Sequence, residues 1–300
     1  MKKKTYLIAL MAMALTLGSC SDNENGIGGE TSKYITVSTS IGNMTRVATD
    51  ANGGQTFEEG DEISVYAWIG APTVAPETRE RVVNNAINKL TNGSWVATPQ
   101  MLWKNNRDKH YFIGVYPTAA ISDLSAGEYT FDVNKQTESD LLVAVNKDGL
   151  SYNVDEQQTV PLTFTHVMAK LAVNLTYKNQ WGGIPTVEKV VVGNAAKEAT
   201  INYLTKVVTP STTAKEDFSL PEITENTKYV SVIIPQKEVT QLTIVIGGKN
   251  FVYDNGTPFK LESGKITTVN LEVGRDEIKL GDVKITNWED GSTFSGEALN

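Results

Sequence analysis

The chain has 300 residues, a formal net charge of −8 at pH 7, 40% hydrophobic residues and a single cysteine. An acidic protein is a poor partner for nucleic acid or for an anionic membrane surface, because both attract basic proteins. One cysteine excludes a disulfide framework within the chain, and the length suits one large domain or two of ordinary size.

Residues 1–19 have the composition of an export signal peptide. Three lysines at 2–4 precede an apolar run at 6–17, and small residues follow. The run is too short to span a bilayer core of about 30 Å, which needs about 20 apolar residues. The stretch 17–20, Leu-Gly-Ser-Cys, resembles a bacterial lipobox, so Cys20 is expected to carry acyl chains, palmitate among them. The alternative is an ordinary signal with a bystander cysteine.

Residues 20–32 are expected to form a flexible tether between the lipid and the folded chain. The segment consists almost entirely of Ser, Asp, Asn, Glu and Gly, which cannot build a core. Its acidic start, with Asp22 and Glu24, resembles the signal that directs Bacteroidales lipoproteins to the cell surface. We therefore expect an outer-membrane, surface-exposed location.

Strand patterns recur through the rest of the chain. In residues 34–41, Ile35, Val37 and Ile41 alternate with small polar residues, as in a half-buried strand. Turn residues such as Asn92-Gly93 separate further runs. In residues 80–90, Val83, Ile87 and Leu90 would share one face of a helix, but Asn92-Gly93 and Trp95 follow at once, so a strand and hairpin are favoured there. The other runs lie at 63–69, 111–116, 141–145, 160–164, 171–177, 187–192, 229–234, 242–246, 266–273 and 283–288.

The strands and turns predict an all-β fold of two β-sandwich domains in series. A break near His166 places the domains at 33–166 and 167–300. In the last strands the apolar alternation changes phase between Leu280 and Val283. A bulge or sharp turn is therefore expected at Gly281-Asp282.

Catalytic, cofactor-binding and metal-ligating residues are not predicted anywhere in the chain. His110 and His166 are far apart in sequence and lack metal-ligand spacing, so both are expected at the boundary of the core. No nucleophile motif is present. Acidic pairs such as Glu58-Glu59 could bind Ca²⁺, and solvated loop charges explain them equally well. A hydrolase would need carboxylates gathered by the fold in one cleft.

Several stretches resemble the fimbrillin family of Bacteroidales, the Mfa-like and FimA-like subunits of type V pili. They follow the order of the family and cover most of the chain after the tether. The resemblance implies two transthyretin-like β-sandwich domains, no cofactor, and a role as a pilus or cell-surface adhesion subunit. The stretches include Thr45-Arg46, "FEEGDEISVYAW" (57–68), "HYFIGVYP" (110–117), "SDLLVA" (139–144), "LTFTHVMAKLAVNL" (162–175), "YVSVIIPQ" (229–236), "LESGKITTVNLEV" (261–273) and "VKITNW" (283–288).

Arg46 is a candidate protease site in the polar loop 42–60, just after the first strand. A cut between Arg46 and Val47 would release the lipidated end together with Ile35, Val37 and Ile41. Burial of each large apolar side chain contributes about 1.5–3 kcal/mol, so the loss would leave an open apolar groove. A strand from another pilus subunit could refill this groove, which is the assembly mechanism that the resemblance implies. The alternative is an ordinary loop arginine.

The C-terminal tail is a poor donor strand, because the segment after Trp288 has only Phe294 and Leu299 as large apolar residues. This departure favours a tip or accessory subunit over a shaft subunit. The expected partners are other pilus subunits, the outer membrane through the lipid, and a host protein or glycan. The alternative function is a lipid-anchored surface protein that binds glycans and does not polymerise.

Overall fold

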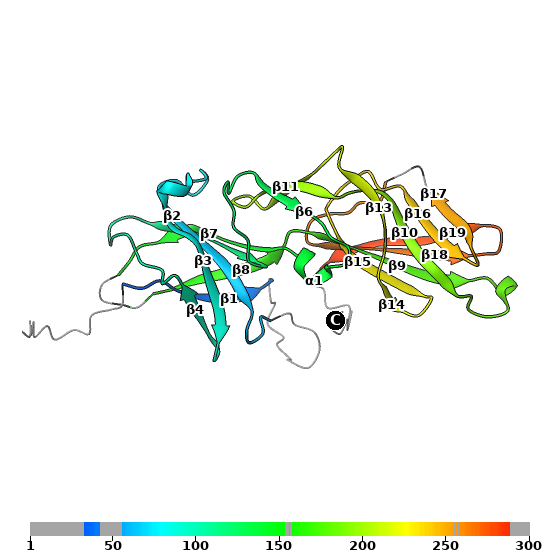
Figure 1. The fold of residues 1–300 in the computed structure, drawn as a ribbon, viewed down its shortest axis with the longest axis horizontal. Coiled ribbons are helices and arrows are strands. Elements are labelled where there is room, and N and C mark those ends of the chain that lie inside the picture. The colour runs from blue at the N-terminus through cyan, green and yellow to red at the C-terminus, as the bar shows by residue number, and fades with distance from the viewer. Residues whose placement is uncertain are drawn as a thin grey trace, which may run out of the picture.

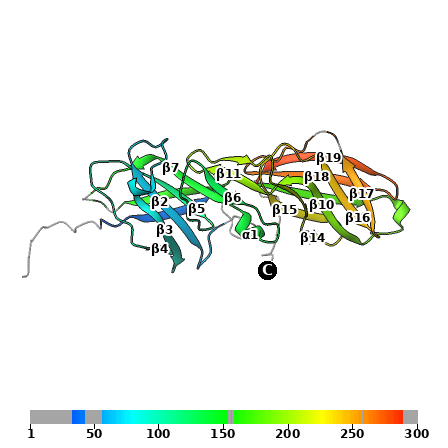
Figure 2. The same ribbon diagram turned by 45° about the horizontal axis from the view of Figure 1, so that its top comes forward.

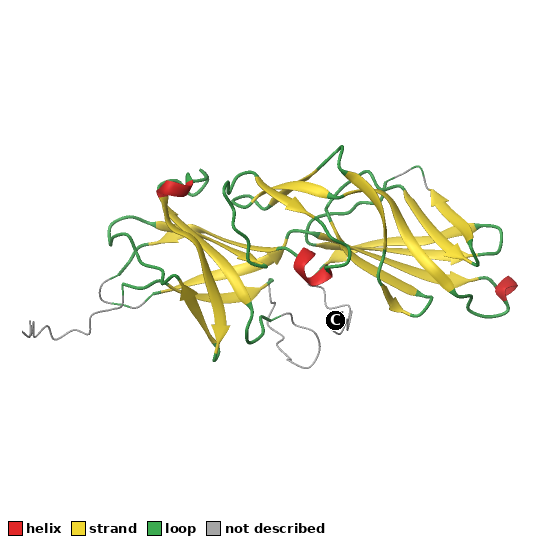
Figure 3. Cartoon of the chain, viewed as in Figure 1, coloured by secondary structure: helices red, strands yellow, loops and turns green. Residues whose placement is uncertain are grey.

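The structure is a computed structural model, and it describes residues 33–42, 56–153, 156, 158–254, 256 and 258–288. Strands make up 57% of it and helices 4%, which confirms the predicted all-β class (Figure 3). In these described ranges, no helix is long and apolar enough to cross a membrane. The helical segments are single turns: η1 (Thr78–Glu80), α1 (Gln136–Ser139) and η2 (Asn179–Trp181).

One sheet of seven strands is formed by the first half of the chain, in the order β1-β8-β7-β5-β2-β3-β4. Neighbouring strands are antiparallel except for β1 and β8, which run parallel. The strands are β1 (Thr36–Ile41), β2 (Glu62–Ile69), β3 (Arg81–Thr91), β4 (Ser94–Thr98), β5 (His110–Tyr116), β7 (Leu142–Leu150) and β8 (Thr159–His166).

In the β3–β4 hairpin, the local sequence determines the turn between the two strands. Asn92 and Gly93 both have positive φ, at 51° and 72°, as a two-residue hairpin turn of the Asn-Gly kind requires. The carboxylate of Glu59 accepts a hydrogen bond from the Asn92 N–H at 2.7 Å. The predicted strand and hairpin in this region are confirmed.

Two further sheets are formed by the second half of the chain, in the orders β13-β10-β16-β17 and β14-β15-β9-β18-β19. In the second of these, β9 and β18 run parallel and the other neighbours are antiparallel. The strands are β9 (Ala169–Tyr177), β10 (Val187–Ala196), β13 (Lys215–Ser219), β14 (Glu222–Thr224), β15 (Lys228–Ile233), β16 (Gln241–Ile246), β17 (Lys249–Asp254), β18 (Lys265–Val273) and β19 (Ile278–Asn287).

A bulge interrupts β19 at the predicted place. Asn270 pairs with Asp282 and Leu271 pairs with Leu280, so Gly281 is an extra residue on β19. A Cβ atom on Gly281 would lie 3.2 Å from the backbone oxygen of Asn270. The change of phase in the apolar alternation therefore marks a real irregularity of the ladder.

A small three-stranded sheet links the two halves of the chain. Its strands, in the order β12-β11-β6, are β12 (Val207–Pro210), β11 (Glu198–Asn202) and β6 (Gly127–Thr130). A continuous apolar core joins side chains of both halves, such as Trp68 and Ile201. The halves lie end to end in both views (Figures 1 and 2). The predicted boundary after residue 166 falls at the connection from β8 to β9, and the division into two sandwich domains stays a prediction.

Candidate functional site

The first strand supplies apolar side chains to the core of the seven-stranded sheet. Ile35 is 1% exposed and Val37 is 7% exposed, whereas Ile41 is half-buried at the edge of the same cluster. The cluster also includes residues of β2, β5 and β8, such as Ile63, Phe112 and Phe164. Of the three apolar residues that alternate in the sequence, Ile35 and Val37 thus lie inside the core and Ile41 lies at the margin of the core.

The outer face of β1 carries hydroxyl groups that match those of β8. The parallel register pairs Thr36 with Thr159 and Ser40 with Thr163. The hydroxyl oxygens lie 3.1 Å apart in the first pair and 3.2 Å apart in the second, at hydrogen-bond distance. β1 is therefore held by burial on one face and by a row of polar contacts on the other.

The second edge of β1 is paired with described residues at its start. Even-numbered residues of the strand direct their backbone groups to β8, as the hydrogen bond from the Gly42 N–H to the Phe164 oxygen shows. Odd-numbered residues face the other way, where Lys33 and Ile35 pair with residues 101–103. Beyond Ile35, no other described strand pairs with this second edge of β1.

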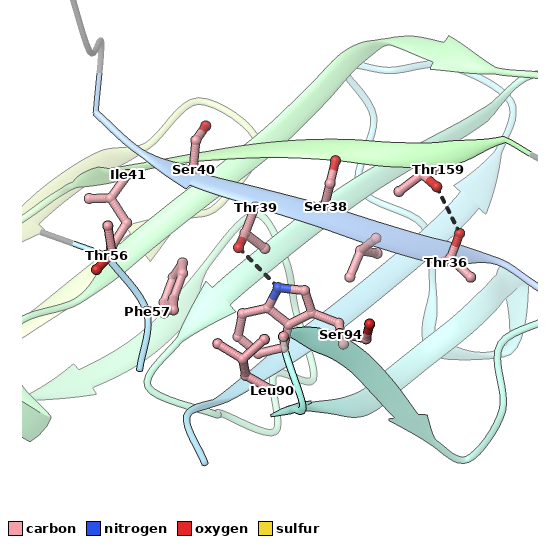
Figure 4. Close-up of a pocket in the computed structure, with 13 residues that line it drawn as sticks. Thr36, Ser38, Thr39, Ser40, Ile41, Thr56, Phe57, Leu90, Ser94 and Thr159 are labelled. Carbon is pink, nitrogen blue, oxygen red and sulfur yellow. Dashed lines mark hydrogen bonds between the residues drawn. The ribbon is translucent and has the colours of Figure 1, made fainter. Parts of the chain in front are cut away.

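A groove of about 690 Å³ runs along this edge, between β1 and the β3–β4 hairpin (Figure 4). β1 and β4 are the two end strands of the sheet, so the sheet curls until its ends face each other. The indole N–H of Trp95 on β4 donates a hydrogen bond to the Thr39 hydroxyl of β1 at 3.0 Å. The groove is lined by Thr36, Val37, Ser38, Thr39, Ser40, Ile41, Thr56, Phe57, Leu90, Gly93, Ser94, Trp95 and Thr159.

Phe57 joins this groove to the core. Its ring makes edge-to-face contacts with Trp95, Tyr116 and Phe164, at centroid distances of 5.3, 5.4 and 5.1 Å. Such aromatic pairs add about 0.5–1.5 kcal/mol each to the burial of their area. Phe57 and Trp95 therefore give the groove an aromatic lining that is packed against the core.

Cys20, Arg46 and Val47 lie outside the described residues, so their predicted roles remain predictions. The described positions that flank Arg46 are Gly42, at the end of β1, and Thr56, in the lining of the groove. The groove residues Phe57 and Trp95 were not predicted as a site. Phe57 opens a stretch quoted for the family resemblance, yet no local pattern in the sequence places it beside β1.

The two histidines lie apart and have separate, satisfied environments. The His110 ring Nδ1 lies 3.0 Å from the Asp108 carbonyl oxygen, and its Nε2 accepts the Lys104 N–H at 3.1 Å. This arrangement fits a neutral ring, and burial lowers the pKa of His110. Both histidines are buried rather than lying at the core boundary as predicted. Among the described residues, no group of three His, Cys, Asp or Glu side chains could hold a metal ion.

His166 belongs to a stack at the end of the last strand. Its Nδ1 lies 2.7 Å from a carboxylate oxygen of Asp140, and its ring stacks on Trp288 at 4.1 Å between centroids. The ammonium of Lys170 lies 4.3 Å from the centroid of the Trp288 ring. Burial lowers the pKa of Lys170, and Asp140 opposes that shift. These contacts attach the end of β19 to β8 and β9.

Solved structures with a similar fold include proteins from Bacteroides species. A candidate cell adhesion protein from Bacteroides ovatus is 18% identical, with a TM-score of 0.62 over 85% of this chain and 98% of that chain. One from Bacteroides uniformis is 19% identical, with a TM-score of 0.61 over 87% and 98%. A fimbrial protein from Bacteroides vulgatus is 14% identical, with a TM-score of 0.52 over 84% and 99%. These likenesses show a shared fold.

Sequence comparison gives the family. No curated protein matches the sequence. The profile described as fimbrillin-like matches residues 45–288, which is most of the chain and includes Arg46 and the groove residues Phe57 and Trp95. The chain therefore belongs to the fimbrillin-like family, whose members are structural, non-enzymatic proteins of the cell surface.

Proposed function

We propose that the chain is a fimbrial subunit made as an outer-membrane lipoprotein on Cys20, cut after Arg46, and assembled by strand exchange. The observation that carries this proposal is the position of β1. It is the first strand of the described chain, it ends the seven-stranded sheet, and over residues 36–41 it pairs only with β8 among the described strands. A strand in this position can leave without unthreading any other strand.

Loss of β1 would have a large cost that another strand could offset. Ile35 and Val37 would leave the core, and each large buried side chain contributes about 1.5–3 kcal/mol. The β8 edge would also lose its backbone partner. An incoming strand with the same alternation would restore both the side-chain burial and the ladder. The partner that fits this gap is a strand of another pilus subunit.

A tip or accessory position is the form of this proposal that we favour over a shaft position. β19 pairs with β18 from Ile278 to Asn287, so its use as a donor would open the chain's own sheet. The residues after Trp288 have few large apolar side chains to offer in its place. Such a subunit accepts a strand and leaves its own last strand in place.

Digestion of the folded chain with an arginine-specific protease tests the proposal. The expected product begins at Val47, as mass spectrometry would identify it, and the cut protein forms oligomers with other pilus subunits in light scattering. Arg46→Ala should abolish this cut. Arg79→Ala is the matched control, because the exposed Arg79 side chain lies in η1, away from β1, and its loss should leave the cut at Arg46 unchanged.

Resistance of the Arg46 bond, or a cut chain that stays monomeric with every added subunit, would contradict the polymerising role. Binding of the uncut chain to an immobilised glycan, with no oligomer at any stage, would instead favour the glycan-binding alternative.

A further inference from the structure

The groove beside β1 exists while β1 still occupies its place in the sheet. We propose that this groove binds an extended, uncharged polypeptide strand, which pairs with the second edge of β1 before β1 leaves. The site is distinct from the gap that removal of β1 would open, because there the new strand pairs with β8. Here it pairs with β1 itself.

Backbone groups supply the first part of the recognition. Val37, Thr39 and Ile41 follow Lys33 and Ile35 in the odd-numbered series, whose N–H and C=O groups face away from β8. Among the described residues, these later groups have no backbone partner. An open edge of this kind is a template for an added strand, because each new residue can exchange hydrogen bonds with it.

The shape of the groove supplies the second part. β1 and β4 form its two sides, and strands pair at a spacing of about 4.8 Å. An occupant lying along β1 would direct alternate side chains toward Phe57 and Leu90 in the groove lining. Thr39 points into the groove and Ser38 and Ser40 point away from it (Figure 4). The Trp95 indole N–H, now bound to Thr39, could pass its hydrogen bond to a carbonyl of the occupant.

Charge decides the chemistry of the occupant. The chain has 62 charged residues, counted as 27 Lys and Arg and 35 Asp and Glu, yet none of the 13 residues that line the groove is charged. A lysine or carboxylate in the occupant would lose water and find no partner among them. Alternating apolar and hydroxyl-bearing residues would match both the aromatic lining of Phe57 and Trp95 and the Thr39 hydroxyl that points into the groove (Figure 4).

This site would give an incoming strand a place to bind before exchange. The role in assembly rests on the proposed function, since the strand would come from another subunit. The binding itself does not rest on it, and it can be measured on a chain whose first strand cannot leave.

A disulfide between β1 and β8 would keep the first strand in place. Ser40→Cys with Thr163→Cys places two thiols where hydroxyl oxygens lie 3.2 Å apart, in a chain whose native cysteine is removed by Cys20→Ser. Thr36→Cys with Thr159→Cys, at 3.1 Å, is the second lock in case the first distorts the sheet. Thiol titration confirms closure.

The probe is the capped peptide of residues 34–42, Tyr-Ile-Thr-Val-Ser-Thr-Ser-Ile-Gly, which is uncharged and alternates as the groove requires. Calorimetry on the locked chain should give a dissociation constant within about twofold of that of the reduced chain. Hydrogen exchange should slow at the amides of Val37, Thr39 and Ile41. Thr36, Ser38 and Ser40 should not change, because β8 already holds their amides.

Two controls test the contacts. Two peptides are N-methylated at alternate residues, one peptide along one edge and the second along the other, which removes the N–H donors of that edge. At least one of them should bind about tenfold more weakly, which corresponds to about 1.4 kcal/mol. Trp95→Ala should weaken binding by a similar factor. Val96→Ala is the matched control, because Val96 is exposed on the same strand and does not line the groove.

Loss of binding in both locked chains would overturn the inference, because the peptide would then bind only where β1 has left its position beside β8. The proposed function would not be affected by this result. Unchanged affinity of both methylated peptides would overturn it as well. Binding to a locked chain whose Arg46 bond proves resistant would support the inference and contradict the proposed function.

Discussion

The first and last strands of the described chain are both edge strands, and they are held in different ways. β1 runs parallel to its neighbour, and Val37 in it and Ile35 just before it are almost completely buried. β19 runs antiparallel to its neighbour, and its apolar residues Leu280, Val283 and Ile285 are 36%, 41% and 38% exposed. The comparison separates two sources of strand stability, side-chain burial and backbone pairing.

Side-chain burial makes β1 costly to remove, and beyond Ile35 its second edge has no backbone partner among the described residues. Backbone pairing with β18 and the stack around Trp288 hold β19, which buries little along its length. The strand whose departure we propose is thus the more deeply packed one. Its release needs a replacement, and this requirement would couple departure to assembly.

The largest expected effect is a difference in stability between variants of the first and the last strand. Ile35→Ala should lower the free energy of unfolding by about 2–5 kcal/mol, because it leaves a cavity in the core. Leu280→Ala should lower it by less than about 1 kcal/mol, because the side chain is already partly in water. Urea unfolding of both variants measures the difference. Equal losses would show that the two strands are held alike.

The second effect concerns the anchor of β19. Trp288→Ala removes the stack on His166 and the contact with Lys170, together worth about 1–3 kcal/mol. Amides of β19 should exchange faster by the corresponding factor, and those of β1 should not change. Trp288→Phe keeps an aromatic ring there and should restore most of the protection. Faster exchange in β1 as well would mean that the two edges are coupled.

The smallest effect is a pH dependence confined to the β1 side. The His110 ring binds the Lys104 N–H, next to residues 101–103, which pair with Lys33 and Ile35. Its pKa is lowered by burial, so the unfolded chain takes up the proton first. The stability that neutral His110 contributes is complete above about pH 6.5, the ordinary pKa of histidine, and is lost as the pH falls.

Urea unfolding of the native chain and of His110→Gln at pH 7 and pH 5 measures this dependence. The native chain should lose more stability than the variant between the two values. An identical loss in both would remove His110 from the explanation.

Local patterns predicted the strands because their causes are local. Asn92-Gly93 dictates a hairpin turn, and the odd step from Leu280 to Val283 marks the bulge at Gly281. The alternation around Val37 identified the buried face of β1. The fold class and these elements could therefore be read from the sequence.

The candidate groove could not be read in the same way, because it depends on pairings between distant segments. The parallel match of Thr36 with Thr159 joins residues more than a hundred positions apart, and turn chemistry says nothing about it. The curl that brings Trp95 to Thr39 arises from the whole sheet. Burial of the histidines was likewise set by contacts such as that between His166 and Trp288.

The parallel direction of β1 also has a mechanical consequence. β1 begins opposite Thr159, and β8 ends at His166, from where the chain runs on into the second half. A pull on the chain before Lys33, against a load carried beyond His166, therefore acts along the two strands in opposite senses. All their hydrogen bonds bear such a force together, rather than one after another as in unzipping. β1 should therefore resist a pull along its own direction more strongly than a pull that peels it away from β8 one hydrogen bond at a time.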